Sequence, residues 1–519
     1  MINDELTLQI LQQLPFTPTQ GQCEAIDVFS RFMTARGENE AMVLRGSAGT
    51  GKTSVARAIV RVMCQLKQKV VLLAPTGRAA KVFALGADHH AFTIHRHIYR
   101  QKQYTGLGGQ FNLGDNKHTD TLFIIDEASM INMGEAYLGG STEGMFGTGN
   151  LLDDLVRYVY SGRNCRMMLI GDAAQLPPVG ADEAPALLTE IVSGYGLQVW
   201  EYDLMEVLRQ SSESGILWNA TMIRHLITTD DITGLPRIRF QGFADIQIVP
   251  GNEIIEQLSS SYSHVGMDET TVITRSNKHA NIYNMGIRSQ VIGYEDQLCT
   301  GEQLMIVKNN YYWMEKQKEA EKEASGNSGA PVEETGSGAG EAERVAGEAE
   351  RVAGEAERSA VPAFLANGDR CVVQRVRNLR ELYGFHYADV WLQLPDYDDY
   401  ELKVTMILDT LLSDAPALTR EQQEKIFNNV MEDYSDIPTK PERLKRLKED
   451  AVFNALQVKY AYAVTCHKAQ GGQWAHVYVD QGYMTDDMLT PSYIRWLYTA
   501  FTRATEHLYL INWPETQVG

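Results

Sequence analysis

The sequence lacks the marks of an exported, disulfide-bonded or membrane-spanning protein. Its six cysteines are scattered without a CxxC pair, which predicts neither a disulfide framework nor a zinc site. No apolar run approaches the roughly 20 residues that cross a bilayer. The N-terminus has neither a basic start nor a continuous apolar stretch. We therefore expect a soluble protein of the reducing cytoplasm.

Positive charge is also scarce. The chain has 47 Lys and Arg against 67 Asp and Glu, a formal net charge of −20. Non-specific affinity for nucleic acid comes mostly from Lys and Arg that meet phosphates, so a generally basic binding face is excluded. Part of the excess negative charge lies in residues 315–361, where acidic side chains outnumber basic ones two to one. Any nucleic acid must therefore run in a local groove.

Residues 315–361 also form the clearest boundary in the chain. A seven-residue unit, GEAERVA, begins at Gly340 and is given three times, with serine replacing valine in the last copy. A coiled coil is one interpretation, but each unit has little apolar surface, and a glycine at every seventh residue weakens a helix. The composition favours a solvated, disordered insertion.

A phosphate-binding loop stands near the N-terminus. The stretch VLRGSAGTGKTSVARAI, residues 43–59, fits GxxxxGK[ST], with an apolar run before it and an amphipathic pattern after it. This is the strand, loop and helix order that puts phosphate on a helix N-terminus. We expect Lys52 to reach the β and γ phosphates and Thr53 to bind Mg²⁺. The predicted nucleotide-binding residues of the loop are Gly46, Gly49, Thr50, Gly51, Lys52, Thr53 and Ser54.

Two later segments complete a hydrolytic site. LFIIDEASMI ends an apolar run in Asp126 and Glu127, where one carboxylate can hold Mg²⁺ and the next can orient and deprotonate water. MLIGDAAQLPPVG then presents Gln175, a neutral side chain able to sense the γ phosphate. A solvated acidic turn is the alternative for the acid pair, but the upstream phosphate loop favours the hydrolytic interpretation.

The rest of the chain alternates short apolar runs with helical patterns, which predicts an α/β protein. The runs VVLLAP, TLFIID, RMMLIGD, TVITR, KYAYAVT, HVYVD and HLYLI indicate buried strands of parallel sheets covered by helices, enough for two sheets. Short alternating strands from near Gly301 onward indicate a small inserted β-barrel. Arg375 and Arg377 lie two apart on one strand, so they either face DNA or form a solvated face.

The motifs together resemble those of superfamily one helicases of the RecD-like and Dda-like branch. The quoted set is GSAGTGKT, APTGRAAK, TIHR, IIDEASM, GDAAQLPPVG, AVTCHKAQGGQW and YTAFTRATEHLYL, in the order of that family. The resemblance implies two RecA-like motor domains, with ATP and Mg²⁺ between them and single-stranded DNA across the top. The expected divisions are a first motor domain at 1–200, a second at 201–300 and 458–519, and an SH3-like subdomain at 301–457 that includes a helical segment at 413–457.

The resemblance also implies roles for individual residues. Gln22 would read adenine, with Gln20 as a close rival because the spacing in FTPTQGQ is ambiguous. Arg275 and Arg503 would reach the γ phosphate from the second motor domain; a plain surface charge is the alternative for each. The implied DNA contacts are Pro75, Thr76, His95, Thr465, His467 and Lys468. His95 and His467 could instead be core histidines held by hydrogen bonds.

A hairpin is predicted at about residues 98–120, where glycines interrupt a polar and aromatic stretch. In the family such a hairpin splits duplex DNA. Phe111 or Tyr104 would then stack on the junction base pair, unless the aromatic ring packs on the base of the hairpin itself.

The sequence therefore predicts an ATP-dependent DNA helicase that moves 5′ to 3′ on single-stranded DNA and unwinds duplex junctions, in DNA repair, recombination or replication. Two alternatives stay open: an RNA helicase of the same superfamily, and an ATP-dependent scaffold subunit of a larger DNA-processing complex with protein partners. No nuclease-like cluster of acids and lysine is recognisable.

Overall fold

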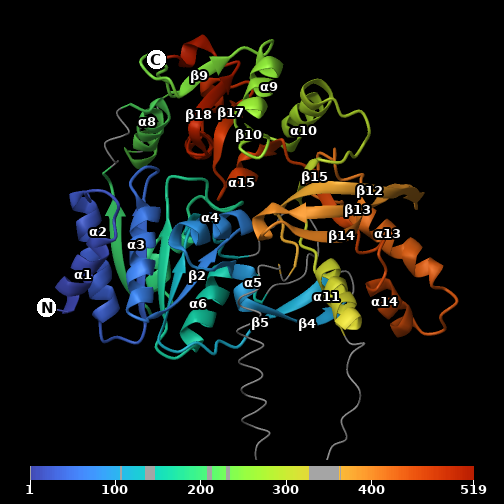
Figure 1. The fold of residues 1–519 in the computed structure, drawn as a ribbon, viewed down its shortest axis with the longest axis horizontal. Helices are drawn as coiled ribbons and strands as arrows, with labels where there is room; N and C mark the ends of the chain where they lie inside the picture. Colours follow the sequence, from blue (N-terminus) through green and yellow to red (C-terminus); the bar gives the residue numbers. More distant parts are fainter. Residues whose placement is uncertain are drawn as a thin grey trace, which may run out of the picture. The chain divides into compact units, whose positions relative to one another are not determined.

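The computed structural model describes residues 2–105, 108–134, 147–206, 213–229, 234–325, 362 and 364–519. The chain divides into two compact units. The large unit holds residues 1–297, 411–425 and 460–519, and the small unit holds residues 298–410 and 426–459. Each is described by itself below, with the element labels of Figure 1. Within the described ranges, no helix is both long and apolar enough to cross a membrane.

The first sheet of the large unit is entirely parallel, with strand order β3-β2-β6-β7-β1-β8. Four of its strands are buried along nearly their whole length, as the apolar runs predict for a sheet covered on both faces. Its strands are β1 (Glu40–Gly46), β2 (Lys69–Ala74), β3 (Ala91–Thr93), β6 (Thr121–Ile125), β7 (Arg166–Gly171) and β8 (Gln198–Leu204). The edge strand β8 continues this sheet past residue 200.

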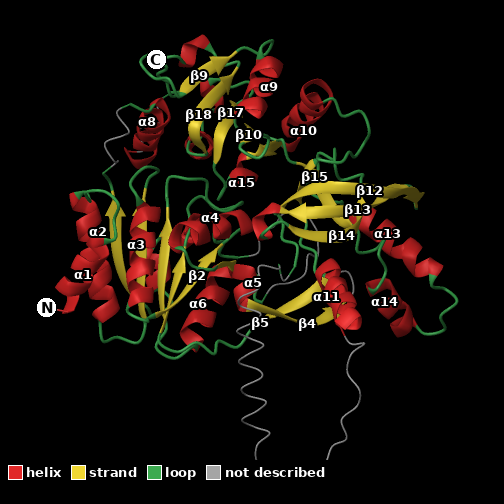
Figure 2. Cartoon of the chain, viewed as in Figure 1, coloured by secondary structure: helices red, strands yellow, loops and turns green. Residues whose placement is uncertain are grey.

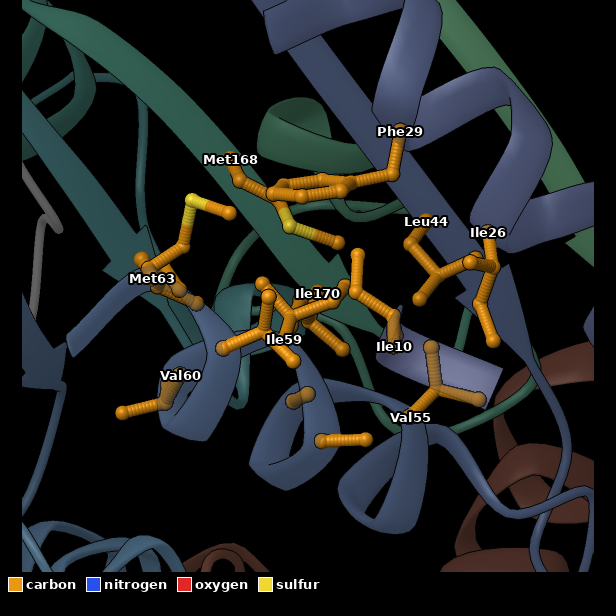
Figure 3. Packing of buried hydrophobic residues seen from close by; sticks show 14 of the residues in the cluster. Ile10, Ile26, Phe29, Leu44, Val55, Ile59, Val60, Met63, Met168 and Ile170 are labelled. Atoms are coloured by element: carbon orange, nitrogen blue, oxygen red, sulfur yellow. The ribbon is translucent and has the colours of Figure 1, made fainter. Parts of the chain in front are cut away.

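Three helices cover one face of this sheet. They are α1 (Ile2–Gln12), α2 (Gln20–Thr34) and α3 (Lys52–Gln65). Alternate residues of the strands, such as Leu44 of β1 and Ile170 of β7, pack against Phe29 of α2 and Ile59 of α3 in one buried cluster (Figure 3). This core holds α3 rigidly behind the loop from which it starts.

A further helix, α4 (Gly77–Ala87), packs on this same face, because its Phe83 and Ala87 belong to the buried cluster. The other helices of this part of the chain are α5 (Ile94–Ile98), α6 (Leu151–Ser161) and α7 (Thr189–Ser193). An antiparallel hairpin of β4 (Tyr99–Thr105) and β5 (Gly108–Leu113) lies where the sequence predicts one. Residues 106 and 107 and the side chains of 101–111 lie outside the description, so the predicted stacking of Phe111 or Tyr104 falls there.

The second sheet of the large unit is also parallel, with strand order β16-β10-β17-β18-β9 (Figure 2). Its strands are β9 (Ile246–Val249), β10 (Thr270–Thr274), β16 (Ala463–Thr465), β17 (Trp474–Asp480) and β18 (Ala504–Ile511). Its helices are α8 (Gly215–Thr229), α9 (Ile254–His264), α10 (Asn277–Gly286), α15 (Cys466–Ala469) and α16 (Pro491–Phe501). We call the two sheets with their helices the first and second lobes.

One predicted strand of the second lobe is wrong in extent. The run KYAYAVT does not form one strand, because β15 ends at Tyr460 and β16 begins at Ala463 in a different sheet. Both pieces are buried, so apolar content alone gave no sign of the break.

The small unit is built on a closed five-stranded barrel, as predicted. The order is β11-β12-β13-β14-β15. Its elements are β11 (Gln303–Ile306), β12 (Arg370–Leu382), β13 (Phe385–Leu394), β14 (Tyr400–Ile407) and β15 (Leu456–Tyr460), with helices α11 (Tyr312–Ser325), α13 (Arg420–Asp433) and α14 (Lys440–Lys448). Arg375 and Arg377 are exposed on β12, opposite Trp391 and Asp389 of β13.

The prediction of disorder from residue 315 onward is wrong for its first part, because α11 runs to Ser325. The reason is anchoring at the start of the helix: Trp313 and Met314 are buried, and Trp313 Nε1 donates to the carbonyl of Asn454 at 2.9 Å. Residues 326–361, which include the GEAERVA repeat, lie outside the described residues.

Candidate nucleotide and nucleic-acid site

The phosphate loop joins β1 to α3, as predicted. Gly49 and Gly51 have φ values of +78° and +84°, a backbone conformation that favours glycine. No side chain caps α3, so the first N–H groups of that helix have no side-chain acceptor. A left-handed turn followed by an uncapped helix N-terminus is the geometry that binds phosphate.

Lys52 lies folded into its own loop. Its Nζ donates to the carbonyl oxygen of Gly46 at 2.7 Å and to that of Ser47 at 2.9 Å. Thr50 Oγ1 donates to the same Ser47 carbonyl at 2.8 Å. Both carbonyl oxygens hold the ammonium next to the N-terminus of α3, where a bound phosphate would lie.

The acid pair follows β6. The side chain of Asp126 accepts a hydrogen bond from the Glu127 backbone N–H at 2.9 Å. Loss of hydration and the neighbouring Glu127 carboxylate raise the pKa of Asp126 to about 6, while Lys52 and Arg57 act in the opposite direction. Glu127 has a φ of +51°, which is uncommon for a residue with a side chain.

The residues here fit a nucleotide with Mg²⁺. Among the described residues, the buried oxygens Ser47 Oγ, Ser129 Oγ and Gln175 Oε1 have no hydrogen-bond partner. Such oxygens cost free energy unless something binds them. Oxygen ligands that include a carboxylate suit Mg²⁺, for which Thr53 and Asp126 are the predicted ligands. Gln175 follows β7, the neighbour of both β1 and β6 in the sheet.

Gln22 lies beside this loop, and both ends of its amide are hydrogen-bonded within the protein. The side chain is completely buried; its Oε1 accepts from the Thr19 N–H at 3.1 Å, and its Nε2 donates to the Thr50 carbonyl at 3.0 Å. Its rival Gln20 donates to Glu24 at 2.9 Å on the exposed side of α2. Gln22 therefore links the start of α2 to the phosphate loop.

The two predicted arginines lie in the second lobe and differ in exposure. Arg275 follows β10, is exposed, and stacks over the Tyr493 ring at 5.4 Å. Arg503 is 2% exposed. Its guanidinium donates to the carbonyls of Thr499 and Gly472 and to the hydroxyl of Thr502 at 3.1 to 3.2 Å. Each guanidinium group is bound by residues of its own lobe.

The predicted DNA contacts follow neighbouring strands. Pro75 and Thr76 follow β2. His95 is the second residue of α5, which directly follows β3, the strand that pairs with β2. Thr76 caps α4 by accepting from the Ala79 N–H at 3.2 Å. His95 packs near the Tyr99 ring, and burial lowers the pKa of His95 to about 4, so its imidazole is neutral at pH 7.

The second lobe carries the remaining predicted contacts at the end of β16 and in α15. Thr465 ends β16, His467 is exposed, and Lys468 is half-buried. Three residues further on, a Cβ at Gly471 would lie 3.0 Å from Thr76 Oγ1 and 3.1 Å from Ala79 Cβ. The loop after Lys468 therefore packs against the start of α4.

Sequence reasoning missed a set of polar contacts between the two lobes. Tyr498 and Thr499 of α16 bind the phosphate loop and the segment that follows β7. Both lie in the quoted motif YTAFTRATEHLYL, where only Arg503 was assigned a role. Two adjacent hydroxyl side chains in WLYTAF, the mostly apolar second half of α16, are the signal that the sequence offers.

Two domain families match the chain. The AAA domain family matches residues 19–137, and the UvrD-like helicase C-terminal domain family matches residues 460–511. The first match covers the phosphate loop and the acid pair. The second covers Thr465, His467, Lys468 and Arg503.

Relatives and solved structures are similar over different shares of the chain. An uncharacterized protein of Methanocaldococcus jannaschii is 33% identical over 170 residues, 30% of this chain and 13% of that protein. The ATP-dependent RecD2 DNA helicase of Deinococcus radiodurans is 30% identical over 184 residues, 36% of this chain and 22% of that protein. The chain thus spans less than a quarter of either relative. Among solved structures, the Pif1 helicase from Bacteroides in complex with ADP-AlF3 and single-stranded DNA is similar to this chain with a TM-score of 0.43 and 13% sequence identity. The superposition covers 97% of this chain and 94% of the Pif1 chain.

The two domain families and the RecD2 relative confirm the resemblance to superfamily one helicases of the RecD-like branch. The fold agrees with it through the two parallel sheets and the inserted barrel.

Proposed function

We propose that this chain is an ATP-dependent DNA helicase that moves 5′ to 3′ along single-stranded DNA. The observation that carries the proposal is that the predicted nucleotide ligands and two of the predicted DNA contacts follow different strands at one edge of the same sheet. The predicted nucleotide ligands follow β1, β6 and β7, whereas Thr76 and His95 follow β2 and β3, the next strands of the same parallel sheet. Ligands bind at the carboxyl ends of such strands. Because both would bind at one edge of the sheet, a change in the bound nucleotide can alter the nucleic-acid contacts, and binding of nucleic acid can alter the nucleotide site.

The residues have separate tasks in hydrolysis. Lys52 and the loop N–H groups bind the β and γ phosphates, and Thr53 and Asp126 hold Mg²⁺, which neutralises phosphate charge when bound. Glu127 orients and deprotonates the attacking water. Gln175 contacts the γ phosphate, and Arg275 and Arg503 stabilise transition-state charge from the second lobe. Motion of the second lobe then depends on the nucleotide.

The predicted nucleic-acid contacts are suited to binding the phosphate backbone of a nucleic acid without regard to its base sequence. Small polar groups and helix N-termini, such as Thr76 at the start of α4 and Thr465 at the start of α15, position phosphates. The insertions support the RecD-like branch and its 5′ to 3′ polarity: in the described residues the first lobe is interrupted by the short β4–β5 hairpin, and the barrel strands β11 to β15 lie in sequence between β10 and β16 of the second lobe. The RecD2 relative is named as a DNA helicase.

The first experiment measures ATP hydrolysis with single-stranded DNA, with RNA of the same sequence, and with neither. Stimulation by DNA alone supports the proposal. Stimulation by RNA alone would identify an RNA helicase, and no stimulation by either would favour a scaffold role.

The second experiment tests polarity with one duplex that carries a single-stranded tail at either its 5′ or its 3′ end. Unwinding from the 5′ tail is expected. Unwinding only from the 3′ tail would contradict the polarity and leave the motor assignment standing.

A further inference from the structure

Tyr498 connects the second lobe to the phosphate loop. It lies in α16 and is 1% exposed. Its hydroxyl accepts a hydrogen bond from the Ala48 backbone N–H at 3.0 Å and donates one to Asp172 Oδ2 at 2.6 Å. Burial and the Asp172 carboxylate raise the pKa of Tyr498 well above its ordinary value. The hydroxyl therefore keeps its proton and remains the donor to Asp172.

The peptide group that Tyr498 binds is also held by Lys52. The Ser47 carbonyl and the Ala48 N–H belong to one rigid, planar peptide unit. Lys52 Nζ donates to its oxygen at 2.9 Å, and Tyr498 accepts from its N–H. When Lys52 turns from this oxygen to a phosphate, the peptide loses its bond to the ammonium, while Thr50 Oγ1 still donates to the same oxygen at 2.8 Å. The bond from the Ala48 N–H to Tyr498 connects the same peptide to the second lobe.

The next residue of α16 binds the segment that carries Gln175. Thr499 Oγ1 accepts from the Leu176 N–H at 2.8 Å, and Gln470 Nε2 donates to the Leu176 carbonyl at 2.6 Å. The carbonyl of Thr499 in turn accepts from Arg503 Nε at 3.1 Å. One helix end therefore contacts the phosphate loop, the segment of the predicted γ-phosphate sensor and the predicted transition-state arginine.

We propose that Tyr498 is a positioning residue that transmits the state of the phosphate loop to the second lobe through the Ser47–Ala48 peptide and Asp172. The inference rests on the proposed function. Tyr498 touches neither phosphate nor DNA in this role; it acts through Ala48 and Asp172. Its loss should leave nucleotide affinity nearly unchanged, because the loop N–H groups and Lys52 remain. It should lower turnover on DNA, because closure of the second lobe is no longer tied to the loop.

The test is Tyr498→Phe in the full chain, which keeps the buried ring and removes only the hydroxyl. The matched control is Tyr478→Phe, another fully buried tyrosine of the second lobe, whose hydroxyl bonds Ser261 and the Gln257 carbonyl in the same lobe. Binding of a fluorescent ATP analogue, kcat and KM for ATP with saturating single-stranded DNA, and the melting temperature are measured for both.

For Tyr498→Phe we expect kcat on DNA to fall by about tenfold or more, as for loss of a hydrogen bond to a charged group, with KM and analogue affinity within about twofold. Tyr478→Phe should keep the wild-type kcat. An unchanged kcat in Tyr498→Phe would overturn the proposal. Equal losses in kcat and melting temperature in both variants would also overturn it, since they would indicate a packing role.

A second variant covers the case in which Tyr498→Phe does not fold. Asp172→Asn keeps the side-chain shape and removes the charge that accepts from Tyr498, and it should lower kcat on DNA in the same way without raising KM. A wild-type kcat in Asp172→Asn would count against the proposal. A wild-type chain without DNA-stimulated hydrolysis would instead refute the proposed function, so the two failures are distinguishable.

Discussion

The Lys52 ammonium lies 2.7 Å from the carbonyl oxygen of Gly46, inside the loop that is predicted to bind phosphate. The ammonium is thus bound by two backbone carbonyls of the loop, and Lys52 itself is the first residue of α3. Neutral carbonyls bind an ammonium more weakly than a phosphate does, because the negative charge of the phosphate adds Coulomb attraction to the hydrogen bond. The exchange of Lys52 partners therefore favours nucleotide binding.

Lys52→Ala should nearly abolish ATP hydrolysis and weaken ATP binding by about tenfold or more, as expected for loss of a hydrogen bond to a charged group. Titration with a fluorescent ATP analogue and a phosphate-release assay measure both effects. Arg61→Ala, which removes an exposed cation from the same helix, is the matched control and should behave like wild type. Wild-type turnover in Lys52→Ala would contradict the assignment of the loop.

Glu127→Gln should separate binding from turnover. The substitution keeps the side-chain shape, so ATP should bind with wild-type affinity, while kcat falls by about a hundredfold or more from loss of the general base. The same two assays apply, with the exposed Glu190→Gln as control. Hydrolysis at the native rate would show that another group deprotonates the water.

The sequence predicted those strands whose residues are both apolar and buried. The apolar runs at 70–75 and 121–126 predicted β2 and β6, because strands of a covered parallel sheet are apolar on both faces. The edge strand β8 has no continuous apolar run, because Gln198, Glu201 and Asp203 interrupt QVWEYDL, and only its last residue is buried. Its Glu201 and Asp203 pair with Arg45 of β1, a contact between residues far apart in the chain.

Tertiary contacts also explain what composition could not predict. The helix α11 extends into a charged stretch because Trp313 anchors its first turn in the small unit. The loop, the acid pair and Gln175 can be proposed as site residues from the sequence because each lies in a short motif at the end of an apolar run. The Tyr498 contact was not, because it depends on how the two lobes pack and joins residues 450 positions apart in sequence.

Gln22 either contacts the adenine base, as its motif predicts, or supports the phosphate loop, and the two roles can be tested against each other. Both ends of its amide are bound within the protein, one of them to the Thr50 carbonyl of the phosphate loop. If this arrangement persists with nucleotide bound, Gln22 acts on the loop and not on the base. Gln22→Ala should then lower kcat/KM for ATP and for GTP by the same factor, about tenfold, because a buried carbonyl loses its donor.

The control for Gln22 is its rival, Gln20→Ala, in which an exposed side chain bonded to Glu24 is removed. It should leave kcat/KM for both nucleotides unchanged. A selective loss for ATP in Gln22→Ala would establish the adenine-reading role that the motif predicts, and a selective loss in Gln20→Ala would assign that role to Gln20.

Asp369 should make the stability of the barrel depend on pH. It is 1% exposed, accepts from the Ala366 N–H at 2.8 Å and the Tyr397 hydroxyl at 3.0 Å, and its Oδ1 has no partner among the described residues. Burial raises the pKa of Asp369 to about 7. Between the unfolded pKa, about 4, and pH 7, the folded state therefore binds a proton that the unfolded state has released. The free energy of unfolding should fall as pH rises through this window, by up to about 1.4 kcal/mol per pH unit.

Asp369→Asn carries no such charge, so its stability relative to wild type should be greater at pH 8 than at pH 5.5 in urea unfolding followed by tryptophan fluorescence. The exposed Asp398→Asn should show the same difference from wild type at both pH values. Parallel pH profiles for wild type and Asp369→Asn would mean that the buried carboxyl does not titrate in this range.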